Sequence, residues 1–380
     1  MDPKRKFFLF KNSENFCSVP WNHFHIWSDG KIKTCSHGKS FGNINQQPLD
    51  EVLNSKEILA IKHDLLNDIP NSNCQHCYAS STKQEHFDLR NHYNPKFSSF
   101  DIDYNDLTSF TLNGIDLHWD NTCNFKCVYC NPAQSSLIAQ EQGLPTNRVD
   151  NNNVDKIIEL VVENQYHIKE VYFSGGEPLL VKNNEKLLAQ ITNENLPIRI
   201  NSNISQANDS NRVLKQLKRF KNVLWTVSAE STHERFEYTR SNGNWEKFID
   251  DLHYVKSLGH QVRLNSVFFV GSAAYLFDTL EYFITEHGIK DITINQLYNH
   301  PYLHVKHCPP LVKQLSLSKL KKILNSNLIE PKSNSYYNIA RCEKELEKSP
   351  NDELDYQHYF DKLDSIRHSN WREIFPELVK

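Results

Sequence analysis

The chain has 380 residues, and its 43 Lys and Arg against 46 Asp and Glu give a formal net charge of −3. At roughly 150 residues per domain, this length predicts two or three domains. A hydrophobic content of 38% and an aromatic content of 11% exclude a disordered chain.

The charge and the distribution of apolar residues also bear on partners and location. A net charge near zero gives no global attraction to nucleic acid or to anionic membranes, so we expect neither as a partner. The longest apolar stretch, Val267–Phe277, is shorter than the roughly 18 residues that a membrane span needs. Phe7–Phe10 is too brief for the apolar region of a signal peptide. We therefore expect a cytoplasmic protein.

The first part of the chain, residues 1–95, predicts a small α+β domain of irregular structure. Its short apolar runs are interrupted by turn residues such as Asp29 and Gly30. Apolar residues at helical spacing predict one helix over residues 49–67. Residues 91–110 are polar and rich in Asn and Ser, and we place a linker at residues 96–111.

From residue 112 the pattern changes to an alternation of strands and helices. Helices are predicted near residues 133–142, 153–166, 184–192, 211–219, 245–257 and 275–287. The predicted strands are Ile115–Trp119, Glu170–Ser174, Ile198–Asn203, Val223–Ala229, Val262–Val270 and Ile292–Leu297. Six strands that alternate with helices indicate parallel βαβ units over residues 112–310, either a doubly wound sheet or a full or partial barrel. Residues 311–380 predict a helical tail that could cover one end of a barrel.

The nine cysteines are the most informative residues, since their clustering in a chain of this size indicates metal or redox chemistry more than disulfides. An odd number also excludes a framework in which all are paired. Cys308 and Cys342 stand alone near the C-terminus. The other seven form two groups: Cys17, Cys35, Cys74 and Cys77, and then Cys123, Cys127 and Cys130.

The second group has the spacing C-x3-C-x2-C and follows the first strand of the predicted barrel. Three thiolates from one short loop can hold three irons of a [4Fe–4S] cluster and leave the fourth iron without a protein ligand. Such an iron is a binding site, as an open position is in catalytic zinc. A zinc site is less consistent with this spacing, because zinc ribbons usually offer paired C-x2-C motifs and four ligands.

About forty residues later, Phe173–Pro178 reads FSGGEP at the end of the second predicted strand. Together with the cysteine spacing, this motif resembles the radical S-adenosylmethionine (radical SAM) superfamily over residues 112–300. The resemblance implies a partial or full (β/α) barrel, here a partial (β/α)6 barrel. It also implies that SAM binds the open iron and is cleaved reductively to a 5′-deoxyadenosyl radical.

The same resemblance assigns expected SAM contacts near the cysteine loop and the Gly-Gly-Glu-Pro motif. Tyr129 matches the aromatic position near adenine. The backbone at Gly175 and Gly176, with Glu177 beside it, would receive the SAM ammonium group, and glycine allows close approach because it has no Cβ. Read alone, this motif would be an ordinary turn.

Further SAM contacts are expected at the ends of later strands. Asn203 is a candidate near the ribose, and Asn265 is a weaker one. Ser228 and Arg240 match positions that bind the SAM carboxylate, a contact suited to arginine. Without the resemblance, Arg240 would read as a solvated charge on a helix.

The first group of cysteines could hold either a structural zinc ion or a fully ligated [4Fe–4S] cluster. The element from Cys17 through Gly30 to Cys35 is similar to the opening of SPASM and Twitch domains, which carry auxiliary iron–sulfur clusters. Four cysteines fit one cluster, as in Twitch, with Asp29 and Gly30 in a tight turn of a hairpin. We expect a closed site with four protein ligands; in the alternative arrangement, substrate displaces one of them. These domains normally follow the barrel, whereas here the cysteines precede it.

The remaining candidates are weaker. Most of the histidines near these cysteines are expected at the surface or around the ligands: His23, His25, His37 and His76. Cys308 could donate a hydrogen atom or electron to a substrate radical, but an unreactive free cysteine is the better interpretation. The same holds for Cys342.

The leading hypothesis is therefore a radical SAM enzyme with two [4Fe–4S] clusters, the second of them auxiliary. Its partners would be a small-molecule or peptide substrate and a reducing protein of the flavodoxin or ferredoxin type. Its substrate would be peptide-, sugar- or nucleotide-like, and no residue selects among these. One alternative is a non-catalytic zinc-binding interaction module, which leaves the second motif unexplained. Another is a radical SAM methyltransferase, for which no cobalamin-binding feature or methyl-accepting cysteine pair is found.

Overall fold

The structure, a computed structural model, describes residues 1–81, 89–97, 102–297, 300–350 and 354–379. The chain divides into two compact units. Unit 1 comprises residues 1–122, 143–200 and 210–223, and unit 2 comprises residues 123–142, 201–209 and 224–380. Among the described residues, no helix is long and apolar enough to cross a membrane.

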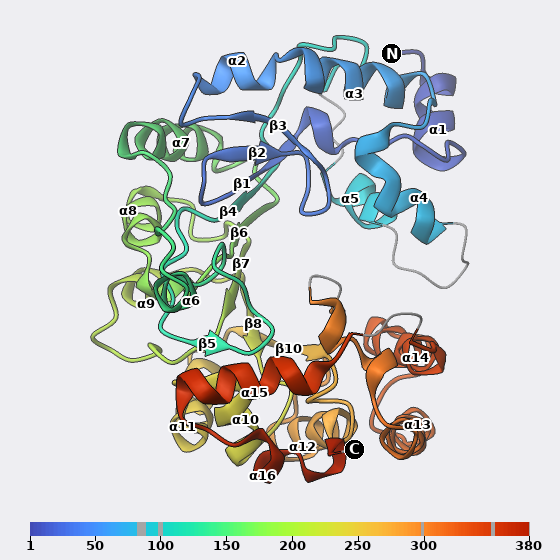
Figure 1. The fold of residues 1–380 in the computed structure, drawn as a ribbon. Helices are drawn as coiled ribbons and strands as arrows, with labels where there is room; N and C mark the ends of the chain where they lie inside the picture. The colour runs from blue at the N-terminus through green and yellow to red at the C-terminus, as the bar shows by residue number, and fades with distance from the viewer. Residues whose placement is uncertain (82–88, 98–101, 298–299, 351–353, 380) are drawn as a thin grey trace. The chain divides into compact units, whose positions relative to one another are not determined.

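Unit 1 is built around a sheet with the strand order β7-β6-β4-β1-β2-β3 (Figure 1). The pairs β1–β4, β4–β6 and β6–β7 are parallel, and β1–β2 and β2–β3 are antiparallel. A strand from the cysteine-rich N-terminal region therefore pairs directly with the first strand predicted for the barrel. The bounds are β1 (His23–Ile26), β2 (Lys31–Lys33), β3 (Ser40–Asn43), β4 (Gly114–Leu117), β6 (Glu170–Phe173) and β7 (Ile198–Ser202).

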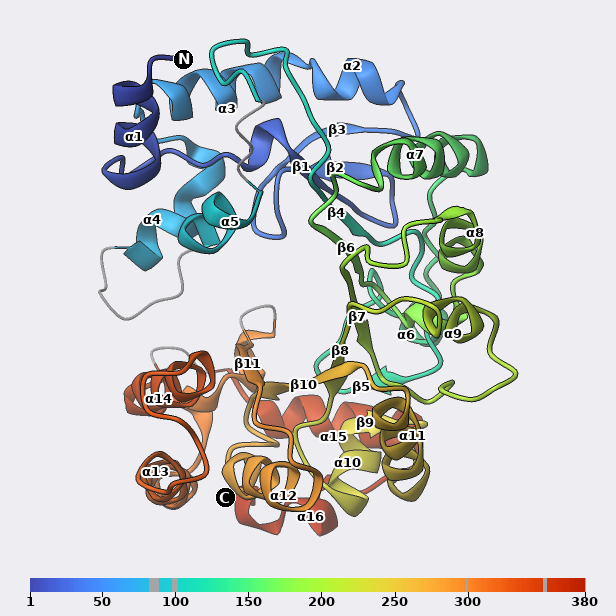
Figure 2. The ribbon, with the colours of Figure 1, turned by 180° about the vertical axis from the view of Figure 1, so that it is seen from behind.

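Helices of unit 1 form two groups. The helices α7 (Asn151–Asn164), α8 (Lys182–Gln190) and α9 (Arg212–Leu217) lie along one side of the strands in Figures 1 and 2. Helix α7 forms because apolar residues recur at helical spacing, and it buries Val154, Ile157, Ile158 and Val161. The N-terminal helices are α1 (Pro3–Lys11), α2 (Leu49–Leu53), α3 (Lys56–Leu66), α4 (Gln75–Ser81) and α5 (Leu89–Phe97).

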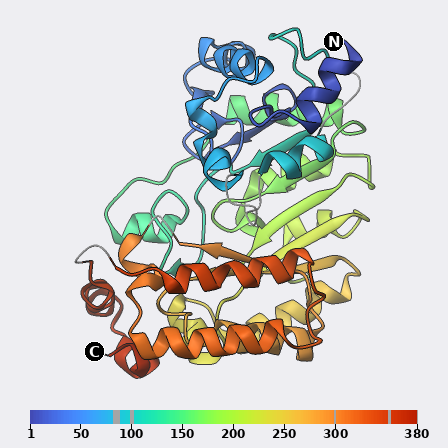
Figure 3. The same cartoon turned by 90° about the vertical axis from the view of Figure 1, so that its right-hand side faces the viewer.

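Unit 2 contains the parallel strands β8, β10 and β11, in the order β11-β10-β8. A separate two-stranded sheet pairs β5 (Lys126–Cys127) with β9 (Arg240–Ser241) in antiparallel fashion. The remaining bounds are β8 (Val223–Ser228), β10 (Gln261–Phe268), β11 (Ile292–Gln296), α6 (Ser136–Glu141), α10 (His233–Thr239), α11 (Trp245–Ser257) and α12 (Leu276–His287). The C-terminal helices, orange to red in Figure 3, are α13 (Pro310–Leu324), α14 (Asn334–Glu347), α15 (Tyr356–Arg367) and α16 (Trp371–Ile374).

The predicted α/β class is confirmed, because each of the six predicted strands is present and helices separate them. Two local predictions are wrong. The helix expected over residues 49–67 is two helices, since the Ser55 side chain accepts a hydrogen bond from the Ile58 amide and caps a new helix. Part of the segment expected as linker forms α5, which contains Pro95. Residues 98–101 lie outside the described residues, and the domain boundaries at 95, 111 and 310 stay predictions.

Candidate metal centres

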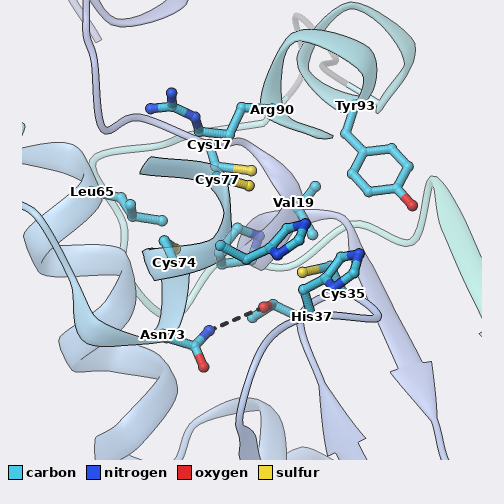
Figure 4. Close-up of a pocket in the computed structure, with 13 residues that line it drawn as sticks. Cys17, Val19, Cys35, His37, Leu65, Asn73, Cys74, Cys77, Arg90 and Tyr93 are labelled. Carbon is cyan, nitrogen blue, oxygen red and sulfur yellow. Dashed lines mark hydrogen bonds between the residues drawn. The ribbon is translucent and has the colours of Figure 1, made fainter. Parts of the chain in front are cut away.

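Four cysteines of unit 1 line one small pocket (Figure 4). Cys17 precedes a short 3-10 turn, Cys35 follows β2, and Cys74 and Cys77 flank the start of α4. The antiparallel β1–β2 pair confirms the predicted hairpin, in which Gly30 has a φ of +81°, a left-handed conformation that favours glycine. The four cysteines of the first sequence group therefore share one site.

The thiols of this pocket oppose each other's ionisation. Burial raises the pKa of Cys17 well above its usual value, and the nearby Cys74, Cys35 and Cys77 add to the rise. Burial likewise raises the pKa of Cys74 to about 11. Thiolates confined in this way need a cationic centre, which the iron–sulfur core or a zinc ion would supply.

The space among these thiols is narrow. The cavity volume is about 20 Å³. No group of three or more Cys, His, Asp or Glu side chains in the described part of the chain is placed to hold a single metal ion. A cluster takes one thiolate on each of its irons, whereas zinc gathers all four thiolates around one atom. Four thiols are the right donor set for a [4Fe–4S] cluster. Because the space among them is narrow, the four cysteine side chains would move apart to hold the cluster.

Polar residues hold the segments that carry these cysteines. Asn73 Nδ2 donates to Thr34 Oγ1 at 3.3 Å and so ties the residue before Cys74 to the residue before Cys35 (Figure 4). The rings of His37 and His76 are exposed and stack with centroids 3.8 Å apart. Both therefore lie at the rim of the pocket, as expected for histidines around the ligands.

His23 and His25 are placed differently. Both are on β1 and are buried, with exposed fractions of 1% and 5%. His23 Nδ1 donates to the Thr34 carbonyl at 2.9 Å, and its Nε2 lies 3.2 Å from Asp116 Oδ1 on β4. These histidines belong to the sheet and are not at the surface.

The second cysteine group forms a loop at the start of unit 2. The Cys123 amide donates to Ser136 Oγ at 3.1 Å, and Ser135 Oγ donates to the Phe125 carbonyl at 2.8 Å. The C-terminal helix α15 also holds the loop, because Tyr359 Oη donates to the Val128 carbonyl at 2.7 Å. Backbone groups of the loop are thus fixed by side chains of neighbouring segments.

A buried charged network lies against this loop. The Arg240 guanidinium donates to Glu230 at 2.8 Å and to Tyr129 Oη at 2.5 Å, and lies 3.8 Å from Cys127 Sγ. Tyr129 Oη in turn donates to the other Glu230 oxygen at 2.8 Å. Burial raises the pKa of Cys127, while Arg240 lowers it. Glu230, which is fully buried, was not predicted, because a single carboxylate after a strand carries no spacing signal.

Two of the three loop cysteines face an open pocket of unit 2. Cys127 and Cys130 line a cavity of about 890 Å³ together with His300, Tyr302 and residues of α6 and α15. The rings of Tyr302 and Tyr359 are 4.6 Å apart there. The C-terminal tail therefore contributes one wall of the pocket that these thiols face.

The candidates at the strand ends of unit 2 are also close to each other or to the loop. Asn203 Nδ2 donates to Asn124 Oδ1, within the cysteine loop, at 3.1 Å. Ser228 on β8 lies opposite Asn265 on β10 in the parallel register. Asn203 thus contacts the loop, and Ser228 and Asn265 lie side by side on neighbouring strands.

The Gly-Gly-Glu-Pro motif lies in unit 1, where two close contacts require its glycines. A Cβ on Gly175 would approach the His118 ring to 2.1 Å, and a Cβ on Gly176 would approach the Thr122 carbonyl to 2.1 Å. The Glu177 amide donates to the same carbonyl at 2.8 Å. The motif is therefore anchored to the residue that directly precedes Cys123.

Cys308 and Cys342 are both buried, and burial raises the pKa of each thiol to about 12. Gln296 donates to Cys342 Sγ at 3.5 Å. Both thiols are therefore protonated at neutral pH.

Comparison with known protein families supports the two cysteine assignments. Residues 120–275 match the sequence model of the radical SAM superfamily, and residues 17–78 match that of an iron–sulfur cluster-binding domain, SPASM. Residues 120–275 therefore form a radical SAM domain, and a SPASM domain precedes it in the chain, as the sequence indicated. The two domains imply a [4Fe–4S] cluster with SAM and an auxiliary iron–sulfur cluster.

Two curated relatives match about half of the chain. A GTP 3′,8-cyclase of Listeria welshimeri is 27% identical over 188 residues, which cover 48% of this chain and 52% of that protein. The radical SAM cyclopropyl synthase TigE of Paramaledivibacter caminithermalis is 26% identical over 200 residues, which cover 49% of this chain and 42% of that protein. The chain spans about half the length of these relatives.

Some solved structures also resemble part of this chain. One is anSMEcpe with bound AdoMet, with 18% identity, a TM-score of 0.42, and coverage of 57% of this chain and 62% of that one. Another is SuiB of Streptococcus suis bound to the precursor peptide SuiA, with 15% identity, a TM-score of 0.40, and coverage of 60% and 51%.

Proposed function

We propose that the chain is an enzyme that cleaves SAM reductively and uses the resulting radical to remove hydrogen from an organic substrate. Cys123, Cys127 and Cys130 would hold the catalytic cluster. When bound, a [4Fe–4S] cluster with one open iron binds SAM and supplies the electron that cleaves it. The observation that carries the proposal is one loop that bears three cysteines, two of which line a large pocket.

The residues around the loop would prepare it for this cluster. Arg240 is a buried cation 3.8 Å from Cys127 Sγ and favours the thiolate that an iron ligand requires. Glu230 and Tyr129 hold the guanidinium in position. Arg240 therefore already has partners in the protein, and its proposed contact with the SAM carboxylate would use the remaining guanidinium nitrogen, Nε, which makes no hydrogen bond.

Other groups would bind the remaining parts of SAM. The backbone of Gly175 and Gly176, beside Glu177, would receive the ammonium group, and the absence of a Cβ at both positions permits close approach. Ser228 would bind the carboxylate and Asn203 the ribose. Tyr129 would lie near adenine.

The pocket formed by Cys17, Cys35, Cys74 and Cys77 would hold the auxiliary cluster with four protein ligands. A reducing protein of the flavodoxin or ferredoxin type would supply electrons, and a cytoplasmic location stays a prediction. The substrate would be a small molecule or a peptide. One relative is named for a nucleotide substrate and one solved structure contains a precursor peptide, so both classes are reasonable first choices.

The test is metal content and SAM cleavage after anaerobic purification and cluster reconstitution. About eight irons per chain are expected for two [4Fe–4S] clusters. With dithionite and SAM, the protein should release 5′-deoxyadenosine, and Cys127→Ala should abolish that release. Cys342→Ala, at a buried cysteine outside both sites, is the matched control and should retain it. Zinc without iron, or equal activity of Cys127→Ala, would contradict the proposal.

A further inference from the structure

One face of the unit 1 sheet is polar although it is buried. Side chains alternate along β4, so Ile115 and Leu117 lie on one face and Asp116 lies on the other. Across the parallel register, Asp116 lies opposite His25 on β1 and Tyr172 on β6, and Tyr172 lies opposite Arg199 on β7. The interior of a (β/α) barrel is normally filled by Val, Ile and Leu. Buried polar side chains in their place indicate a surface that contacts a ligand.

The two carboxylates of this face already have partners. Asp116 contacts His23, and Glu170 accepts hydrogen bonds from Lys96 at 2.5 Å and from Arg199 at 3.1 Å. Burial would raise the pKa of Asp116, but the histidines and Arg199 lower it to about 2. Both carboxylates are thus ionised and already paired with cationic or hydrogen-bonding side chains of the protein, so neither requires a cationic group from a ligand.

Most of the unsatisfied atoms of the face are nitrogens, although Asn201 Oδ1 on β7 also lacks a hydrogen bond. Among the described residues, the buried nitrogens that lack a hydrogen bond here are both ring nitrogens of His25, Nε2 of His118, Nε1 of Trp27 and Nε of Arg199. His25 and His118 have exposed fractions of 5% and 1%. The indole and guanidinium nitrogens are donors only, and the neutral imidazole of His25 offers one donor and one acceptor. Nε2 of neutral His118 is an acceptor, because its other ring nitrogen donates to the backbone of Asp120. Trp27, Arg199 and His25 therefore offer donors that lack an acceptor.

Three of these groups form a contiguous cluster, which we call the imidazole–indole cluster: His25, Trp27 and His118. The rings of His25 and Trp27 stack with centroids 5.1 Å apart, and Trp27 is 5.6 Å from His118. Lys33 Nζ lies over the Trp27 ring, 4.5 Å from its centre, and adds a cation to the cluster. The side chains of Trp27 and Lys33 are partly exposed, whereas the Trp27 Nε1 atom is buried.

The cluster also adjoins the Gly-Gly-Glu-Pro motif. The His118 ring is the group that a Cβ on Gly175 would strike. A ligand group held by the cluster would thus lie beside the segment proposed to receive the SAM ammonium group.

We propose that the imidazole–indole cluster binds an oxyanion group of the substrate, a carboxylate or a phosphate. The inference rests on the proposed function, because it takes the neighbourhood of the Gly-Gly-Glu-Pro motif as the reaction site. An oxyanion would accept from Trp27 and His25 and would be attracted by Lys33. The N-terminal SPASM region would then contribute directly to substrate recognition through β1 and the residue that follows it.

The test uses three small probes on the reconstituted holoprotein: propionate, methyl phosphate and the neutral isostere propionamide. Saturation-transfer NMR at constant ionic strength should detect one of the two anions and not the amide. Trp27→Phe keeps an aromatic side chain and removes the indole N–H, so the anion should bind about tenfold more weakly. Trp225→Phe is the matched control, since its indole donates to His260 at 3.0 Å in unit 2, and it should bind as the wild type does.

The anion that binds identifies the chemical class, carboxylate or phosphate. Equal binding of propionamide, no binding of either anion, or unchanged anion binding by a folded Trp27→Phe variant would overturn the proposal. Iron content and deoxyadenosine release are measured on the same preparation. Anion binding without SAM cleavage would reject the proposed function and support the oxyanion site. SAM cleavage without anion binding would support the proposed function and reject the oxyanion site.

Discussion

The two sets of cysteines differ in what surrounds the sulfur atoms. In the four-cysteine pocket of unit 1, the charged neighbours that most affect Cys17 are the other three thiols, and the free space is about 20 Å³. In the three-cysteine loop of unit 2, Cys127 has Arg240 as its strongest charged neighbour and faces a pocket of about 890 Å³. The first arrangement suits a cluster enclosed by its ligands. The second provides a cation of its own and leaves room for another molecule.

Separate cysteine variants sharpen this contrast most strongly. Cys74→Ala should lower the iron content from about eight to about four per chain while deoxyadenosine release with dithionite persists. Cys127→Ala should give the same iron content and no release. Iron and sulfide assays with chromatography of the products measure both. If Cys74→Ala also stopped SAM cleavage in a folded protein, the two sites would not be independent.

The buried cation beside the loop gives the next largest expected effect. Arg240→Gln leaves Glu230 buried without its charged partner, a change that costs about 3–5 kcal/mol of unfolding free energy. Urea denaturation of the reconstituted protein measures the loss. Arg372→Gln removes an arginine from an exposed ion pair with Asp361 and should change stability little. Equal effects of the two variants would show that Glu230 gains no stability from Arg240.

The polar face of unit 1 should make stability depend on pH. Burial is the main cause that lowers the pKa of His25 from 6.5 to about 4. The carboxylate of Asp116 raises this pKa, and the positive charges of His23, Lys33 and Arg199 lower it further. Its contribution is present above pH 6.5 and is lost between pH 6.5 and 4, because the unfolded chain binds the proton more readily. The size of this term is about 3 kcal/mol.

Urea denaturation of His25→Gln and wild type across this pH range checks the prediction. The variant should lose less stability on acidification. His63→Gln, at an exposed histidine, is the control and should follow the wild type. A His25→Gln curve parallel to the wild-type curve would mean that another group governs the acid sensitivity.

The sequence predicted most of the barrel because its signals are local. Apolar alternation located all six parallel strands, and cysteine spacing with Gly-Gly-Glu-Pro located the family. It could not show that β1 joins the sheet, since four residues between turns give too little periodicity to reveal a partner some ninety residues away. The sequence did not identify Glu230 as a site residue for a related reason. Its pairing with Arg240 becomes visible only in the structure, where α10 and β9 bring the two side chains together.

The pairing of β1 with β4 bears on whether the protein can be divided. Without β1, the backbone of residues 114–117 would form a free edge beside β6, and unpaired edges invite association with other chains. A fragment that begins at the barrel would expose this edge. We therefore expect the cysteine-rich N-terminal region and the barrel to fold and resist proteolysis together, and truncation between them to yield insoluble protein instead of two separable domains.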